Sequence, residues 1–481
     1  MKKFKKIAFA GFIAVLSIQA SAQNTWSLQQ TVDYALENNI SIKQSDIQAR
    51  MAGVNLKQIK ESRFPSLSAG ANYGYSAGRN QDPTTFNLIT QGFWTSSYSL
   101  QSSVNLFNWF ALNNNIDASK FEAAAAQKSV EKLKNDVSLN VAAAYLQALV
   151  NKEQVHASKV QIELTTAQLE NTRKLVAAGA VPELNAAELE AQLARDSSTL
   201  VSAEMMEIQS VLQLKALLNM DAAIPFDIDN PDVANIPVES LLSLQPEYVY
   251  SLAREAMPLQ KVNEFRVAAA KSTLKAARAQ MLPSVSMFGS LGSSTNNQAF
   301  EVIGVNSIPN VNPIGRVSVG GTEYNVVPFN PTTNVPITRK QGYFDQVNQN
   351  FRQSVGLSLS IPIFSGGQLR ANRSRQQLNL ENTLLQQKAD DLDLKQTIYR
   401  AYAEAYSALQ KYQASEKSVQ AAQKVYDFAS KRYENGMLQT LELITNQTNL
   451  FRATIDKLTA QYDYVFKMKV LEFYKGSGIK L

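Results

Sequence analysis

The stretch Ser97 to Phe107, SYSLQSSVNLF, alternates between apolar and polar side chains, with Ser102 and Phe107 as the exceptions. Its apolar positions are Tyr98, Leu100, Val104 and Leu106. The same alternation returns at Ser354 to Phe364, SVGLSLSIPIF. Successive side chains of a strand point to opposite faces of a sheet. Each stretch therefore predicts a strand with one apolar and one polar face.

The chain contains two copies of one plan. An offset of 257 residues places Gly179 on Gly436, and an offset of 218 places Pro65 on Pro283. The offsets differ by 257 − 218 = 39 residues, which predicts an insertion within 295–350 of the second copy. Its counterpart in the first copy is a short polar segment at about 77–96. Such long-period self-similarity indicates a duplicated structural unit.

Each copy predicts the same order of elements: a helix ending at a proline, two strands, a very long helix and a return helix. The expected helices are 26–63, 109–178 and 183–219 in the first copy, and 244–281, 366–435 and 440–474 in the second. The first strands of the two pairs begin at Leu67 and Ser284. The domain plan is then a first repeat at 23–219, a linker at 220–243 and a second repeat at 244–481, with a long loop at about 295–350.

Residues 1–22 predict a secretory signal peptide. Four lysines precede an apolar run from Ile7 to Ile18, and Ala20-Ser21-Ala22 matches a cleavage site. Removing these lysines lowers the net charge from +6 to 6 − 4 = +2, which favours no nucleic-acid partner. The sequence has no cysteine and no run of ~18 apolar residues for a membrane helix. Any membrane crossing is therefore expected to use strands.

The expected return helices carry apolar stripes with the 3,4 spacing of coiled coils. The stripe of the last helix is Leu441, Ile444, Thr448, Phe451, Ile455, Leu458, Tyr462 and Val465. The matching stripe of the first copy is Leu184, Ala187, Ala191, Ala194, Ser198, Val201, Met205 and Ile208. One such stripe is typical of an ordinary helix core. Four very long helical segments together indicate an extended assembly of coiled coils.

Strands of about eleven residues with apolar and polar faces suit a transmembrane barrel with a wet lumen. Aromatic residues stand at both ends of the second strand, as in membrane interfaces: Phe93, Trp94, Tyr98, Phe107, Trp109 and Phe110. Four strands cannot close a barrel, and open edges are not tolerated in lipid. Two chains would give eight strands with a filled interior, whereas three give twelve with room for a passage. We therefore expect a trimer.

Four short motifs stand at defined places in this plan. They are ALENN at Ala35–Asn39, IPIFSGG at Ile361–Gly367, KLVAAGAVPELNAAE at Lys174–Glu188 and RYENGMLQTLELITNQT at Arg432–Thr448. With the duplicated plan, they make the chain resemble the TolC-like outer membrane efflux protein family over the whole mature sequence. The resemblance implies a mixed fold, internally duplicated: a trimeric 12-stranded outer-membrane β-barrel continued by a 12-helix periplasmic α-barrel of coiled coils.

The resemblance also implies partners and a location. The partners are two further copies of the chain, a periplasmic adaptor protein, an inner-membrane transporter of RND or ABC type, and outer-membrane lipid. The location is the outer membrane of a Gram-negative bacterium, with a long periplasmic extension. The implied function is the outer-membrane exit duct of a tripartite efflux or type I secretion system, which conducts substrates passively.

The family's functional residues map onto the two helix-hairpin tips. Adaptor docking falls on Ala178, Gly179, Ala180, Asn435, Gly436 and Met437. The periplasmic pore constriction falls on Glu442 and, one turn later, Thr445. Three copies of Glu442 would form a ring that favours cations, although a solvated helix position is the plain alternative. The gating contact falls on Tyr433, whose arginine and acidic partners in the family align here with Leu438 and Asn185. We therefore expect a different latch.

Nothing in the sequence predicts catalysis or a cofactor. The single histidine, His156, lies in a long helix and makes a poor metal site without cysteine. Asp390, Asp391 and Asp393 suit a charged helix face better than a cation site. Ser129 and Lys132 form an S-x-x-K fragment without its companion motifs. Besides the duct, a trimeric barrel-anchored coiled-coil surface or scaffold protein is the second hypothesis, and a hydrolase is the third.

Overall fold

The computed structural model describes residues 25–81, 87–229, 236–309, 312–327, 329 and 332–476. The predicted signal peptide lies outside them. The chain divides into two compact units, a helical unit (residues 1–56, 117–271 and 377–481) and a sheet unit (residues 57–116 and 272–376). Among the described residues, no helix is both long and apolar enough to span a membrane.

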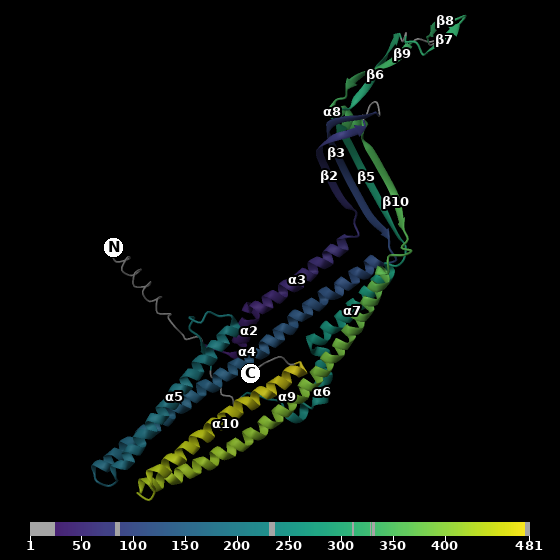
Figure 1. Cartoon of the computed structure of the whole chain (residues 1–481). Helices are drawn as coiled ribbons and strands as arrows, with labels where there is room; N and C mark the ends of the chain where they lie inside the picture. The colour runs from purple at the N-terminus through teal and green to yellow at the C-terminus, as the bar shows by residue number, and fades with distance from the viewer. Residues whose placement is uncertain are drawn as a thin grey trace, which may run out of the picture. The chain divides into compact units, whose positions relative to one another are not determined.

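The sheet unit is built on four antiparallel strands in the order β10-β5-β3-β2 (Figure 1). Their bounds are β2 Ser66–Gln81, β3 Leu88–Phe107, β5 Ser284–Asn296 and β10 Arg352–Ser360. Leu100 of β3 pairs with Ala69 of β2 and with Leu291 of β5. Leu357 of β10 pairs with Met287 of β5. Directly paired residues share a face, so the apolar parities of all four strands coincide.

We call these two surfaces the apolar face and the polar face. The apolar face carries Leu67, Ala69, Ala71, Tyr98, Leu100, Val104, Met287, Leu291, Val355 and Leu357. The polar face carries Ser68, Ser97, Ser99, Gln101, Ser286, Ser290, Ser354 and Ser358. One aromatic, Phe288, lies on the polar face beside Gly356, where a Cβ would come within 2.7 Å of its ring. The predicted alternation is thus matched in register by every strand of the sheet.

The first strand pair is longer than the sequence predicted. The expected polar segment at about 77–96 is wrong as a loop, because β2 and β3 remain paired as far as Gln81 opposite Leu88. In the second copy, residues 295–350 are not one irregular loop. They hold an antiparallel pair of β6 Phe300–Pro309 with β9 Thr332–Lys340, a second pair of β7 Gly315–Val319 with β8 Thr322–Val326, and the helix α8 Tyr343–Gln349.

The helical unit contains two long helix hairpins (Figure 1). The first joins α4 Ala111–Ala177 to α5 Glu183–Leu218, and the second joins α9 Gln368–Glu434 to α10 Thr440–Lys475. α4 and α9 have 67 residues each, and α5 and α10 have 36 each. The bounds confirm the predicted long and return helices to within about two residues, which is the usual uncertainty of helix ends.

Each leading helix is broken, although the sequence predicted continuous segments. The first copy has α2 Leu28–Asn38 and α3 Ile40–Glu61, and the second has α6 Pro246–Ala256 and α7 Pro258–Ala279. Asn39 has an extended backbone, and its side chain donates to the Leu217 carbonyl and accepts from the amides of Ser41 and Ile42. In the second copy the break falls before Pro258, because proline has no amide hydrogen to donate to the preceding turn of a helix.

A buried core joins the leading helices to the hairpins. In the first copy it includes Val32, Tyr145, Leu149, Leu214 and Ile228, all nearly inaccessible to solvent. The short strands β1 Thr25–Trp26 and β4 Asp227–Ile228 pair in parallel beside it. The Tyr145 hydroxyl lies 2.8 Å from the Trp26 carbonyl, and burial raises the pKa of this phenol, so it stays a neutral donor.

Lysines fasten the connecting segment after α5, which includes a short 3₁₀ turn at Leu241–Ser243 (η2). The Lys215 ammonium donates to the carbonyls of Ala222 and Ile224. The Lys152 ammonium lies 2.7 Å from Asp227. Lys469 donates to the Pro237 carbonyl. These bonds hold an irregular segment against regular helices, since its backbone carbonyls need partners.

The two apolar stripes differ in solvent exposure. In α10, Ile444, Tyr462 and Val465 are buried, as expected of a helix seam. In α5, the side chains of the stripe face solvent: Leu184 is 65% exposed, Val201 60% and Ile208 53%. The face of α5 that packs within the chain is the opposite one, which carries Leu189, Asp196, Ala203 and Ser210. The stripe of α5 therefore has no cover within the described chain.

Candidate functional site

The candidate site lies at the two hairpin turns, which have the same backbone geometry. The Gly179 amide donates to the Val176 carbonyl and the Ala180 amide to the Leu175 carbonyl. At the second turn, Gly436 donates to Tyr433 and Met437 to Arg432. Both are Schellman motifs, in which a left-handed residue ends the helix.

The glycines take that left-handed conformation. Gly179 has φ of 66° and Gly436 has φ of 69°. A side chain at either position would be strained, which explains why both turns carry glycine. Met437, next to the second glycine, is exposed. The six predicted docking residues thus lie at or next to two matching helix turns.

Tyr433 links the two hairpins. Its hydroxyl lies 2.9 Å from the Thr172 hydroxyl of α4 and 3.4 Å from that of Thr440. A turn further from the tip, Gln168 donates to the Tyr426 hydroxyl across the same pair of hairpins. Leu438, which stands where the family has arginine, packs in the apolar cluster beside Tyr433. The residue predicted as a gating contact is therefore held by hydroxyl partners within the chain.

A buried polar network that the sequence did not predict lies near these contacts. Asp196 of α5 accepts from Thr165 at 2.7 Å and from Gln192 at 2.7 Å. Gln447 of α10 donates to Thr165 and so joins the second hairpin to the first. Asp196 stands seven residues from both Leu189 and Ala203, which are core positions. An acidic residue at a heptad core position is the signal that could have revealed it.

Glu442 and Thr445 lie on the exposed side of α10, while Leu443, Ile444 and Gln447 on the other side are buried. The Thr445 hydroxyl donates back to the Leu441 carbonyl. Glu442 is in the first turn of α10, where the helix dipole favours a carboxylate. The structure brings the two predicted constriction residues onto one face, three residues apart.

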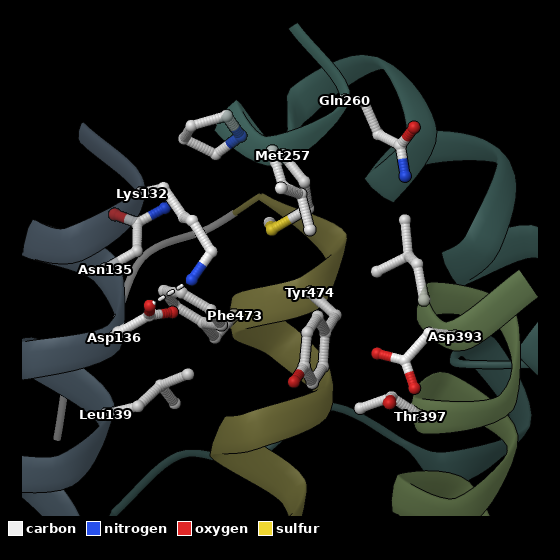
Figure 2. A pocket seen from close by; sticks show the side chains of 13 residues that line it. Lys132, Asn135, Asp136, Leu139, Met257, Gln260, Asp393, Thr397, Phe473 and Tyr474 are labelled. Atoms are coloured by element: carbon white, nitrogen blue, oxygen red, sulfur yellow. Dashed lines mark hydrogen bonds and ion pairs between the residues drawn. The ribbon is translucent and has the colours of Figure 1, made fainter. Parts of the chain in front are cut away.

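A cavity of about 210 Å³ lies between α4, α7, α9 and α10 (Figure 2). The Lys132–Asp136 ion pair spans 2.5 Å on one wall. Burial, together with Asp136 and Asp393, raises the pKa of the Tyr474 hydroxyl. Gln260 is only 6% exposed, and its amide nitrogen is buried without an acceptor. The cavity is thus lined by helices of both copies, and the Gln260 amide nitrogen in its wall is an unsatisfied donor.

The residues considered for catalysis or metal binding are engaged elsewhere. The Ser129 hydroxyl donates to the Ala125 carbonyl, and Lys132 pairs with Asp136. Asp390 accepts from Asn263, and Asp391 accepts from the Tyr250 hydroxyl. Within the described ranges, no group of three or more His, Cys, Asp or Glu side chains could hold a metal ion.

Solved structures of other proteins share this fold. The chain matches the solved structure of the outer membrane protein VceC from Vibrio cholerae with a TM-score of 0.69 at 15% identity, covering 94% of this chain and 97% of that one. It matches CusC, whose structure is described in terms of transmembrane channel formation, with a TM-score of 0.68 at 17% identity, covering 96% of both.

Sequence comparison defines the family. The chain belongs to the outer membrane efflux protein family, whose sequence model matches residues 31–220 and 249–476. It is 22% identical over 473 residues to outer membrane protein TolC of Escherichia coli K12, covering 97% of this chain and 84% of TolC. It is 21% identical to outer membrane protein OprJ of Pseudomonas aeruginosa, covering 88% and 78%. The protein is thus an outer-membrane channel protein and not an enzyme, as predicted.

Proposed function

We propose that this protein is the outer-membrane exit duct of a tripartite efflux or type I secretion system. In this proposal three chains form a 12-stranded barrel and a 12-helix periplasmic barrel. A periplasmic adaptor and an inner-membrane transporter of RND or ABC type deliver the substrate. The relatives include the alkaline protease secretion protein AprF of Pseudomonas aeruginosa and the toluene efflux pump protein TtgC of Pseudomonas putida, so both transport modes occur among similar proteins.

The observation that carries the proposal is the common register of the four strands. Every apolar parity falls on one face, while β2 and β10 are the outer strands of the sheet. Unpaired backbone groups at such edges cost several kcal/mol each in lipid. Closure with further copies removes these edges. Three copies give 3 × 4 = 12 strands, enough to enclose a passage lined by serine and glutamine.

The exposed stripe of α5 supports the same assembly. Leu184, Val201 and Ile208 stand at coiled-coil spacing on a helix face that the chain itself leaves uncovered. Small residues between them, including Ala187, Ala191 and Ala194, allow a close approach of a second helix. In a trimer this stripe meets a helix of the neighbouring chain and closes the helical barrel.

The proposal assigns a place to each part of the chain. Residues 1–22 direct secretion, 220–243 form an equatorial belt, and the arm within 295–350 lies outside the cell. The tips at Gly179 and Gly436, with their neighbours, dock the adaptor. Glu442 and Thr445 line the periplasmic entrance, and Tyr433 holds the hairpins closed until docking separates them.

Purified protein in detergent and deletion of the gene test this function. We expect a molar mass of three chains by light scattering and ion conductance in planar bilayers. A deletion strain should accumulate a fluorescent efflux dye, and the gene in trans should restore efflux. A monomer that stays dissolved without detergent contradicts the proposal. Unchanged dye efflux combined with lost surface adhesion favours the scaffold function instead.

Charged substitutions at the tips test docking. The double variant Ala178→Arg, Met437→Arg should still conduct ions as a trimer but fail to restore efflux, because the turns no longer fit the adaptor. The matched control Thr199→Arg changes an exposed position elsewhere on the first hairpin. Full efflux by the double variant would move the docking surface away from the tips.

A further inference from the structure

The sheet unit holds a second hollow, on the apolar face beneath α8. We propose that this hollow binds an acyl chain of lipopolysaccharide, the lipid of the outer leaflet. The helix α8 then lies at the membrane surface and keeps the bound chain against the sheet. This inference rests on the proposed function, in which the apolar face contacts lipid.

Helix α8 packs directly on the apolar face. The Tyr343 hydroxyl lies 2.5 Å from that of Tyr98, and the Ser293 hydroxyl donates to the Val347 carbonyl at 2.7 Å. Tyr98 and Ser293 are a directly opposed pair, so both side chains leave the sheet on the side of Leu100 and Leu291. Helix α8 is thus on the face proposed to meet lipid, not on the serine-rich face proposed to line the passage.

The helix covers the point at which the apolar face becomes polar. Ser96 and Thr295 pair across β3 and β5, and both are buried although they lie on the apolar face. Gln346 of α8, also buried, accepts from the Asn296 amide and donates to the Gln341 carbonyl. These bonds satisfy the polar groups there. They fix α8 at the polar end of the apolar face rather than across the middle of that face.

The hollow lies between α8 and the apolar face, and its volume is about 490 Å³. Its floor includes Ala69 and Ala71 of β2, whose small side chains leave a depression beside the larger Leu100 and Leu291. Val347 and Phe351, on and just after α8, line its other side. A hollow lined largely by alkyl and aromatic side chains suits a hydrocarbon chain, because it offers apolar contact.

The surroundings match the headgroup level of a membrane. Tyr73, Tyr75 and Trp94 cluster on the same face, with Tyr73 stacked on Trp94 at 5.0 Å between ring centroids. Phe344 of α8 is 82% exposed. Tyrosine and tryptophan are enriched at membrane interfaces. The apolar side chains of a helix that lies on a membrane enter the boundary between headgroups and acyl chains.

The position of α8 along the strands selects the outer leaflet. β3 runs directly into α4, and β2 follows α3, so the helix-bearing end of the sheet is the periplasmic end in the proposed duct. Helix α8 lies near Trp94 and Asn296, at the opposite end. Two exposed cations at this end, Arg79 and Lys340, suit the phosphates of lipopolysaccharide.

Photo-crosslinking in intact outer membranes tests the inference. Benzoylphenylalanine replaces one residue at a time: Phe351 in the hollow, Leu357 on the apolar face and Phe288 on the polar face. Phe351 and Phe288 are a matched pair, since both are exposed aromatics of the sheet unit. We expect lipopolysaccharide adducts, identified by mass, at Phe351 and none at Phe288. The substitution Ala69→Trp fills the floor of the hollow and should lower the adduct yield at Phe351 several-fold while leaving that at Leu357 unchanged.

The three positions separate the possible failures. Lipid adducts at Leu357 with none at Phe351 overturn the lipid site and leave the duct standing. An absence of lipid adducts at Leu357 overturns the membrane-facing sheet and, with it, the proposed function. A phospholipid adduct or a protein adduct at Phe351 overturns the assignment to lipopolysaccharide. An adduct at Phe351 that persists undiminished in Ala69→Trp places the lipid outside the hollow.

Discussion

The two copies of the repeat have helix hairpins of matching length and different surfaces. Helices α5 and α10 have equal length and follow matching turns, yet the stripe is exposed on α5 and, beyond Leu441, buried or half-buried on α10. At the junctions before the long helices, Trp109 and Phe110 adopt the positive φ angles that Gly366 and Gly367 adopt in the second copy. Corresponding backbone positions of the two copies therefore carry different side chains with different exposure.

The strained junction shows this difference most directly. Left-handed backbone costs roughly 1–2 kcal/mol per non-glycine residue, and the second copy avoids that cost with glycine. The first copy retains two exposed aromatics, which contact Phe107 at 5.4 and 6.2 Å between ring centroids. In the proposed barrel this end of the sheet is the inner membrane interface, where aromatic side chains are enriched.

The largest expected effect tests the α5 stripe as an interface between chains. Met205→Glu places a charge within the stripe, and we expect loss of the trimer, because a desolvated unpaired carboxylate is costly. Light scattering in detergent measures the mass. The control Met206→Glu makes the same change one residue away, off the stripe, at equal exposure of 50%. Equal behaviour of the two variants would remove α5 from the interface.

The second effect concerns charge at the entrance. Glu442→Lys changes the charge by two in each chain, or 2 × 3 = 6 in a trimer, and should shift the bilayer reversal potential from cation towards anion preference. Thr445→Glu should strengthen cation preference. Glu183→Lys, in the first turn of the other return helix, is the matched control and should change the potential less. An unchanged potential in Glu442→Lys would place the constriction elsewhere.

The third effect concerns the junction before α9, where a side chain is added at one of the two glycines, Gly366 and Gly367. Gly367→Ala should lower the free energy of unfolding by roughly 1 kcal/mol, because φ is 79° there and nothing else hinders a Cβ. Gly53→Ala, within α3, should raise it by roughly 0.5–1 kcal/mol, since alanine favours a helix more than glycine does. Thermal unfolding at one scan rate compares them. A stable Gly367→Ala variant would show that the junction relaxes.

The sequence predicted regular elements better than contacts. Period-two and heptad patterns located the strands of the sheet and the seams of the return helices, because burial requires those periods, and the turn glycines located the ends of the long helices. The break at Asn39 escaped prediction, since it depends on a bond to the distant Leu217 carbonyl. The Asp196 network escaped for the same reason: its partners come from three helices. Helix α8 was hidden in a segment whose composition is typical of loops.

The last prediction concerns a position at which the copies differ inside the core. Gln260 of the second copy occupies the place of Ile42 in the first, at the offset of 218, and both are buried. The Gln260 amide nitrogen lacks an acceptor, so its desolvation is uncompensated. We expect Gln260→Ile to raise the free energy of unfolding by about 1 kcal/mol, measured by thermal unfolding. The reciprocal Ile42→Gln should lower it by more, because it buries an amide where no partner exists.

A loss of stability in Gln260→Ile would mean that the amide is satisfied in the assembled protein, by a water or by a neighbouring chain at the cavity. In that case the copies differ at this position because only the second faces such a partner.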